Sequence, residues 1–337
     1  MKYTGKIIVL AFPDTFVKMS DELMCKILPL VGLGTRTHIK AGHAALVLIE
    51  NETGNALYYD FGRYITPPSK GRVRGPNTDV ELEIPFKARI QNGTLENLEE
   101  FLLWLDAHPE KTHGSGRLVA SLCEDINYKK AQDYINSLQG QGSVPYRAFG
   151  KVGSNCARFV TETILSGTDN KSIIKHLTHN KKFTPSTIGN VEKSANSGVF
   201  EVQNGVIQAY GSTALRENLT NYFDKKVPAS YTEETVKNVL PEDAQLLTGI
   251  GSSAYFRLEQ EKDILVITRY TEEGVPDFQG YCPIPKDFDS SSAFKFVYDS
   301  NCEFCTVQQG SELFRLELKK KESNTATASS VQRVHSA

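Results

Sequence analysis

The sequence lacks the features that would assign it to a broad class at once. It has only 6 cysteines in 337 residues, too few for a secreted domain held by disulfides, so a reducing compartment is expected. Its 38 basic and 40 acidic side chains give a net charge of −2, which excludes a strong field for nucleic acid or for an anionic membrane surface. No apolar run approaches the ~20 residues of a membrane helix. We therefore expect neither a nucleic-acid partner nor a membrane span.

The start of the sequence also lacks the features of an export signal. The apolar run from Ile7 to Phe12 is shorter than a secretory h-region, ends at Pro13 and is not followed by a small-residue cleavage site. Such a run is typical of a buried strand. We therefore expect a soluble, cytoplasmic protein, and the length of 337 residues predicts two domains with separate cores.

The first domain, residues 1 to 190, has the mixed helices and strands of the α+β class. Its clearest feature is a predicted hairpin with strands at 43–49 and 56–61, joined by the turn residues 51–54. Further strands are expected at 7–11, 80–84 and 117–122. Helices are expected at 21–28 after a Ser20 cap, after a Thr94 cap, at 128–138 and at 156–165.

The second domain, residues 197 to 319, is predicted to be mostly β. It follows a segment at 180–198 that is rich in Lys, Ser, Thr, Asn and Gly, where we place the boundary. A hairpin at 199–210 around Asn204-Gly205 opens it, and two helices at 215–223 and 233–240 come next. Strands are then expected at 254–258, 264–270, 294–298 and 313–318. The tail, residues 320–337, has no apolar periodicity and is predicted to be disordered.

One cysteine stands where a helix is expected to begin. Cys156 follows the cap-forming Gly153-Ser154-Asn155 and precedes a segment with one apolar face. A thiol in the first turn of a helix lies near free backbone amides and the positive end of the helix dipole, and both favour the reactive thiolate. Those amides are also suited to part of an oxyanion hole, with Asn155 in support. The pattern therefore favours Cys156 as a nucleophile.

A histidine and a carboxylate on the predicted hairpin complete a catalytic set. His43 begins the first strand directly after Gly42, which permits close approach of a neighbour. In the expected hairpin register, Asp60 on the second strand lies opposite or diagonal to His43 on the same face. Such a carboxylate orients an imidazole that acts as a base. His38 is the main rival for the role of base, from a less favourable position.

These segments resemble the circularly permuted branch of the NlpC-type papain-like superfamily, with its YiiX-like bacterial hydrolases and lecithin retinol acyltransferase-like enzymes. The resemblance covers residues 1 to about 190. Asn155-Cys156-Ala157-Arg158-Phe159-Val160-Thr161 is similar to the nucleophile helix of the branch, and Gly42-His43-Ala44-Ala45-Leu46 to its histidine strand. His43 precedes Cys156, as the permuted order requires.

The resemblance implies a fold with an antiparallel sheet and a nucleophile helix, and a polar third residue at Asp60. Tyr146 stands where the family often has a tyrosine, which implies a supporting role near the oxyanion. Lecithin retinol acyltransferase-like enzymes usually have a second histidine in place of Asp60, and they commonly carry a membrane-anchoring helix. Both departures weaken a lipid acyltransferase assignment for this chain.

Other polar residues give less specific signals. Arg63, Arg72 and Arg74 follow the Asp60 strand and are candidates for binding a substrate carboxylate, although a solvated surface loop is the simpler interpretation. Cys302-Glu303-Phe304-Cys305 lacks the second ligand pair that zinc needs. His176 and His179 lack completing ligands as well. No metal or other cofactor is therefore expected.

Three functions remain open at this point. The first is a cysteine hydrolase, a thiol peptidase or amidase, that cleaves a peptide-like amide or an ester through an acyl-enzyme on Cys156. The second is an acyltransferase that uses the same site. The third is a non-catalytic binding module of papain-like shape, in which the second domain makes the functional contact with an unknown protein partner.

Overall fold

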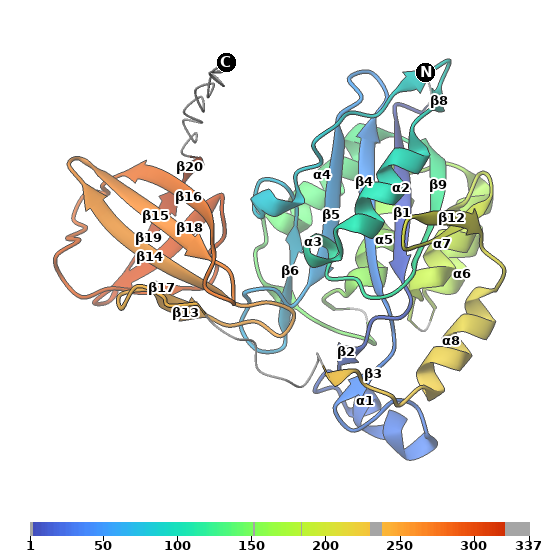
Figure 1. Cartoon of the computed structure of the whole chain (residues 1–337), viewed down its shortest axis with the longest axis horizontal. Helices are drawn as coiled ribbons and strands as arrows, with labels where there is room; N and C mark the ends of the chain where they lie inside the picture. The colour runs from blue at the N-terminus through green and yellow to red at the C-terminus, as the bar shows by residue number, and fades with distance from the viewer. Residues whose placement is uncertain (1–2, 151, 183, 230–237, 321–337) are drawn as a thin grey trace, which may run out of the picture.

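The computed structural model describes residues 3–150, 152–182, 184–229 and 238–320. Its first part is built on an eight-stranded antiparallel sheet (Figure 1), in the order β10-β6-β5-β4-β1-β9-β11-β12. The strands are β1 (Gly5–Phe12), β4 (His43–Glu50), β5 (Ala56–Gly62), β6 (Lys70–Arg74), β9 (Leu118–Ile126), β10 (Val144–Pro145), β11 (Val199–Gln203) and β12 (Val206–Ala209). The predicted hairpin of residues 43–61 is confirmed as β4 and β5.

Helices cover both faces of this sheet. On one face lie α4 (Tyr128–Gln139), α5 (Cys156–Gly167), α6 (Lys171–Asn180) and α7 (Thr187–Ser194), and on the other lies α2 (Leu98–Ala107). The side chains of β1 alternate between the two cores, with Ile7 and Val9 in one and Ile8 and Leu10 in the other. Every residue of β1 is buried, which explains why this strand is a continuous apolar run rather than an alternating one.

The boundary that the composition predicts within residues 180 to 198 does not separate the domains. The hairpin of β11 and β12 forms as expected, but Phe200 pairs with Ala120, so β11 extends the first sheet along β9. The helix α8 (Ala214–Phe223) then packs beside α7. A polar linker composition therefore marks here a connection within one sheet, because an edge strand can pair with any later strand that reaches it.

The second part of the chain is mostly β, as predicted. Its five-stranded sheet has the order β13-β14-β15-β16-β20 and its three-stranded sheet the order β17-β18-β19. The bounds are β13 (Gln245–Leu247), β14 (Ala254–Glu261), β15 (Ile264–Tyr270), β16 (Pro276–Pro283), β17 (Lys295–Val297), β18 (Phe304–Gln309), β19 (Glu312–Glu317) and β20 (Lys319–Lys320). Of these, β13, β16, β18 and β20 were not predicted.

Several local predictions need correction. The expected strand at 80–84 is a single 3-10 turn, η2 (Val80–Leu82). Thr94 lies in a short strand, β8 (Thr94–Leu95), and α2 begins only after Asn97. The helix α1 (Leu23–Ile27) follows Glu22 and not a Ser20 cap. Such short runs are compatible with a strand or with a helical turn, so their periodicity does not distinguish the two.

The remaining elements are short. They are η1 (Leu28–Val31), β2 (Val17–Lys18), β3 (His38–Ile39), β7 (Ile90–Gln91) and α3 (Pro109–Thr112). The predicted helix at 233–240 falls largely outside the described residues, as does the tail after Lys320.

The two parts of the chain meet at the loop between β5 and β6. Gly251 N donates to Arg63 O and Ile65 N donates to Ser252 O, both at 3.0 Å. The Ile65 side chain belongs to the core of the second, mostly β part. This loop therefore leaves the first sheet after β5, places Ile65 in the core of the second domain and returns to the first sheet at β6.

Candidate active site

Cys156 is the first residue of α5, as the sequence predicts. The Asn155 side chain caps the helix and accepts a hydrogen bond from Arg158 N at 2.9 Å. The Asn155 amide nitrogen donates to Arg147 O at 2.7 Å. Asn155 is therefore committed to the cap and to the loop before it, so its side chain supports Cys156 rather than offering an oxyanion donor.

His43 lies at the start of β4, next to Cys156. Its Nε2 is 3.3 Å from Asp60 Oδ2, and Cys156 lies close enough to the ring to raise the pKa of His43. Ala45 opposes Asp60 in the hairpin, so Asp60 is diagonal to His43, which confirms one of the two registers considered. A Cβ on Gly42 would lie 2.9 Å from Thr187 Oγ1 at a φ of 74°, so this position requires glycine.

Asp60 is fully buried and has three further hydrogen bonds. Arg74 holds it with two contacts, Nε to Oδ1 at 3.0 Å and Nη2 to Oδ2 at 2.5 Å. The Tyr58 hydroxyl donates to Oδ2 at 3.2 Å. Burial alone would raise the pKa of Asp60, but Arg74 and His43 outweigh it and hold the pKa well below its usual range. Asp60 is therefore a fixed negative charge behind the imidazole.

The environment of His43 favours its charged form. Burial lowers the pKa of His43, yet the hydrogen bonds to Asp60 and Cys156 outweigh burial and raise it to about 9. The ring lies between Phe12 and Tyr64, with centroid distances of 6.2 Å and 6.5 Å. This packing fixes the plane of the imidazole. An imidazolium beside a thiol can stabilise a thiolate, the reactive form of cysteine.

The three arginines predicted to meet substrate are instead buried and bound to protein groups. Arg74 pairs with Asp60 and lies 3.9 Å above the Tyr64 ring. Arg72 binds Asp79 with two contacts, at 2.6 and 2.7 Å. Arg63 donates to a main-chain carbonyl and lies 4.6 Å above the Tyr146 ring. Arg72 and Arg74 belong to the strand β6, where the sequence suggested a loop, and both side chains are buried.

Residues 7–173 match the family model described as Type VI secretion system effector TseH-like. This TseH-like region is about half of the chain and contains Cys156, His43 and Asp60. Residues 244–319 match the DUF6695 C-terminal domain. A crystal structure of the type VI secretion system effector TseH has 17% sequence identity and a TM-score of 0.41, with 62% of this chain and 98% of that chain covered. No curated protein sequence matches the chain.

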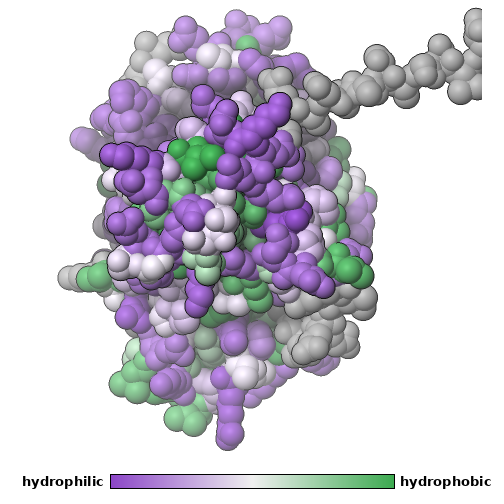
Figure 2. All heavy atoms as spheres, turned by 90° about the vertical axis from the view of Figure 1, so that its left-hand side faces the viewer, coloured by the Kyte–Doolittle hydropathy of each residue, from purple (hydrophilic) through white to green (hydrophobic). Residues whose placement is uncertain are grey.

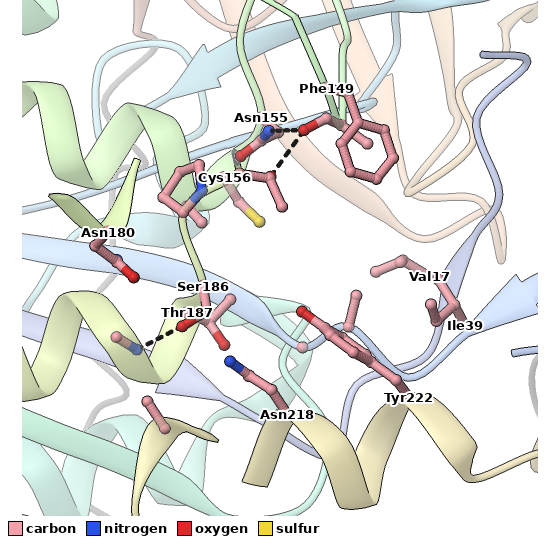
Figure 3. A pocket seen from close by; sticks show the side chains of 18 of the residues that line it. Val17, Ile39, Phe149, Asn155, Cys156, Asn180, Ser186, Thr187, Asn218 and Tyr222 are labelled. Carbon is pink, nitrogen blue, oxygen red and sulfur yellow. Dashed lines mark hydrogen bonds between the residues drawn. The ribbon is translucent and has the colours of Figure 1, made fainter. Parts of the chain in front are cut away.

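A cavity of about 800 Å³ lies over the Cys156 thiol (Figure 3). Tyr146, which the family resemblance implies as a supporting residue, lines this cavity together with Cys156. Burial and the neighbouring Cys156 raise the pKa of Tyr146, so its hydroxyl keeps its proton. The Cys156 sulfur points into the open space between Phe149 and Tyr222. The Cys156 thiol is therefore accessible to a ligand in this cavity.

Two residues of the site, His113 and Tyr222, did not emerge from the sequence, and a third, Arg74, emerged with a different role. Arg74 directly opposes Asp60 in the pairing of β5 with β6, a signal that needed β6 to be recognised as a strand. His113 stacks on Tyr64 at a centroid distance of 5.1 Å, and burial followed by the Arg74 charge lowers its pKa to about 3. Tyr222 comes from α8, beyond the TseH-like region, and no local pattern relates it to Cys156.

The other candidates lie elsewhere. His38 is on β3, where its Nδ1 contacts Thr37 Oγ1 at 3.0 Å. Cys302 is buried, and burial raises the pKa of its thiol to about 12, which suits packing rather than redox chemistry. Among the described residues no group of three or more His, Cys, Asp or Glu is placed to hold a metal ion. Within the same residues, none of the helices combines the length and the apolar character needed to cross a membrane.

Proposed function

We propose that the chain is a cysteine hydrolase that cleaves an amide, such as a peptide bond, or an ester through an acyl-enzyme on Cys156. One observation carries this proposal: Cys156 at the start of α5 lies beside His43, whose Nε2 is 3.3 Å from Asp60 Oδ2, and Cys156 lines a cavity. The permuted papain-like fold is part of the proposal. The TseH-like match supports a type VI secretion effector role, in which this hydrolysis is the effector activity.

In the proposed first step, the Cys156 thiolate attacks the substrate carbonyl carbon and forms a C–S bond. The carbonyl electrons move to oxygen, which the backbone amides at the start of α5 and the Tyr146 hydroxyl stabilise. His43, charged by its contacts with Asp60 and Cys156, gives its proton to the departing amine or alcohol as the C–N or C–O bond breaks. The acyl group remains on sulfur.

In the second step, water attacks the thioester. The neutral His43 takes a proton from this water, the C–S bond breaks, and a carboxylic acid leaves. Asp60 keeps the imidazole oriented throughout, and Arg74 keeps Asp60 ionised. If an amine or alcohol replaces water, the same site is an acyltransferase, which is the nearest alternative chemistry.

The test is covalent labelling of the intact protein. We expect iodoacetamide to modify Cys156 faster than the five other buried cysteines at neutral pH, and His43→Ala to abolish the difference. Mass spectrometry of a reaction with an activated ester should show an acyl group on Cys156 that water removes. An acyl group that leaves only when an amine is added identifies the transferase. A Cys156 no more reactive than Cys123 indicates the binding module instead.

A further inference from the structure

The cavity over Cys156 has an apolar wall from a part of the chain that neither family match covers. The TseH-like match ends at residue 173 and the second match begins at residue 244. Helix α8 lies between them, and its residues Leu215, Leu219 and Tyr222 line the cavity. In Figure 3, Tyr222 extends from α8 into the cavity, across from the Cys156 sulfur. The wall that faces the nucleophile is therefore particular to this intervening segment.

This wall is firmly attached to the first domain. Thr213 caps α8 by accepting from Arg216 N at 3.3 Å. Asn221 is buried and donates to Pro13 O at 2.8 Å. At the end of the helix, Gly34 N donates to Tyr222 O at 2.7 Å. These contacts join α8 to the loops before β3 and after β1, so the cavity is a built site and not a chance gap.

The remaining walls are also largely apolar. Val17 and Ile39 lie on one side, from the paired strands β2 and β3. Leu28 and Leu33 flank them, and Phe149 closes the side next to the nucleophile. The volume of about 800 Å³ lies in the range of small-molecule sites, ~300 to 1,000 Å³. Because most of these lining side chains are apolar, the space suits a bulky apolar group.

Exposed apolar side chains continue this surface around the cavity. Large apolar residues are exposed on α1 and η1 and again on α8: Leu23, Leu30, Val31, Leu215, Leu219 and Phe223. The two sets meet, because a Cβ on Gly32 would lie 3.7 Å from the Phe223 ring. In Figure 2 hydrophobic side chains gather at the lower edge of the molecule, at the height at which Figure 1 places α1. Apolar surface gathered at a cavity mouth is typical of a binding site.

The positions of the catalytic groups indicate which part of a substrate fills the cavity. Cys156 lines the cavity, whereas His43 does not. In the proposed mechanism His43 protonates the leaving group, which must therefore depart on the His43 side. The acyl group stays bonded to the Cys156 sulfur, which points into the cavity. The cavity is thus on the acyl side of the bond that breaks.

We infer that the cavity binds a bulky apolar group on the acyl side of the substrate, with α8 as the element that determines specificity. The inference rests on the proposed hydrolase activity and narrows its substrate class. The shared chemistry is an apolar group within a few bonds of the carbonyl, supplied either by a fatty acyl chain or by the apolar side chain of an acylamino acid.

The test compares two series of p-nitrophenyl esters on the full chain. One series has acetyl, octanoyl and dodecanoyl groups, and the other has N-acetyl-glycyl, N-acetyl-leucyl and N-acetyl-phenylalanyl groups. We expect kcat/KM to rise at least about tenfold along one series, since each buried methylene strengthens binding. The series that rises identifies the source of the apolar group.

The variant Leu219→Gln should remove most of that rise, with its largest effect on the longest or bulkiest ester of the series and its smallest on the acetyl ester. Its matched control is Leu103→Gln, an exposed leucine of α2 on the opposite face of the sheet, which should leave both series unchanged. Equal kcat/KM along both series, or a rise that Leu219→Gln does not alter, would overturn the inference.

A binding measurement separates this inference from the proposed function. Dodecanoate and N-acetyl-phenylalanine are titrated into Cys156→Ala, and into Cys156→Ala with Leu219→Gln. If no ester is hydrolysed but one ligand binds and Leu219→Gln weakens it at least about tenfold, hydrolysis is wrong and the apolar site stands. If esters are hydrolysed without preference and neither ligand binds, the hydrolase stands and the apolar site is wrong.

Discussion

Two arginines on β6 show how one kind of ion pair serves two regions of the molecule. Arg74 and Arg72 are two residues apart, both are buried, and each holds a buried aspartate with two hydrogen bonds. The partner of Arg74 is Asp60, which contacts His43. The partner of Arg72 is Asp79, which also contacts Arg269 of the second domain at 3.4 Å.

The difference lies in what each carboxylate meets next. Asp60 meets an imidazole beside the candidate nucleophile, so the Arg74 pair is the back of the candidate site. Asp79 meets Arg269, whose guanidinium also contacts Glu81 at 2.6 Å and Asp277 at 2.7 Å. The Arg72 pair is thus the start of a charge network between the domains. The two Arg–Asp pairs have the same local chemistry, and the next residue that each aspartate contacts, His43 or Arg269, determines the role of the pair.

The largest effect should come from removing either carboxylate. Asp60→Ala and Asp79→Ala each leave a buried arginine unpaired, so each should lower the free energy of unfolding by about 3–5 kcal/mol. In protein that remains folded, only Asp60→Ala should also reduce kcat/KM, by roughly 10³-fold or more. Urea unfolding and ester hydrolysis measure the two quantities. A comparable loss of activity in folded Asp79→Ala would show that the two pairs are not distinct.

Replacing the arginines tests the same comparison with a milder change. Arg74→Met leaves Asp60 with His43 and Tyr58 as partners. The Asp60 carboxylate loses its main stabilising charge and is no longer held in one position beside the His43 imidazole. We expect kcat/KM to fall roughly 10–100-fold, as for the loss of a group that orients a catalytic residue. Arg72→Met should lower the free energy of unfolding about as much as Arg74→Met does, but it should reduce kcat/KM less. Inactivation rates with iodoacetamide give a second measure of Cys156 reactivity.

The pH dependence of kcat/KM should distinguish the Arg74–Asp60 pair from the Arg72–Asp79 pair, because only Asp60 contacts His43. Because its pKa is raised to about 9, the imidazolium that the mechanism requires is lost above that pH, and kcat/KM should fall there. Asp60→Asn removes a charge that raises this pKa, so the fall should move to lower pH by about 1 unit or more. Asp79→Asn is the control and should leave the profile in place. If Asp60→Asn does not shift the pH profile, Asp60 does not control the pKa of His43.

The same shift predicts how stability changes with pH. A group with a raised pKa in the folded state binds its proton more tightly there than in the unfolded chain. The contribution of His43 to stability is therefore complete below its ordinary pKa of 6.5 and is lost as the pH rises through about 9. In His43→Gln, the free energy of unfolding should no longer show this loss between pH 6.5 and about 9.

The sequence predicts the elements that carry local signals. The β4–β5 hairpin has a turn between two apolar runs, and α5 follows a cap at Asn155, so the sequence alone puts forward Cys156, His43 and Asp60 as candidates. Arg74 was found for the wrong reason, because β6 is short and its residues are typical of a loop. The position of α8 carried no local signal, since long-range packing and not periodicity brings Tyr222 to the cavity.

The smallest expected effect concerns the link between the two regions. Ile65 has a φ of 48°, unfavourable for a β-branched residue, and its side chain is buried in the core of the second domain. Tyr64, its neighbour, lies under the Arg74 guanidinium. Ile65→Ala should weaken the docking of the second domain and lower the free energy of unfolding by about 2–4 kcal/mol. We expect kcat/KM to fall only severalfold, because Asp60 keeps Arg74 in place when Tyr64 moves. Arg269→Met should act in the same direction, since it breaks the junction at Asp79 and leaves Asp60 untouched. If either change reduced activity as much as Arg74→Met does, the Arg72 network and the Arg74 pair would form one functional unit, and the second domain would be part of the candidate site.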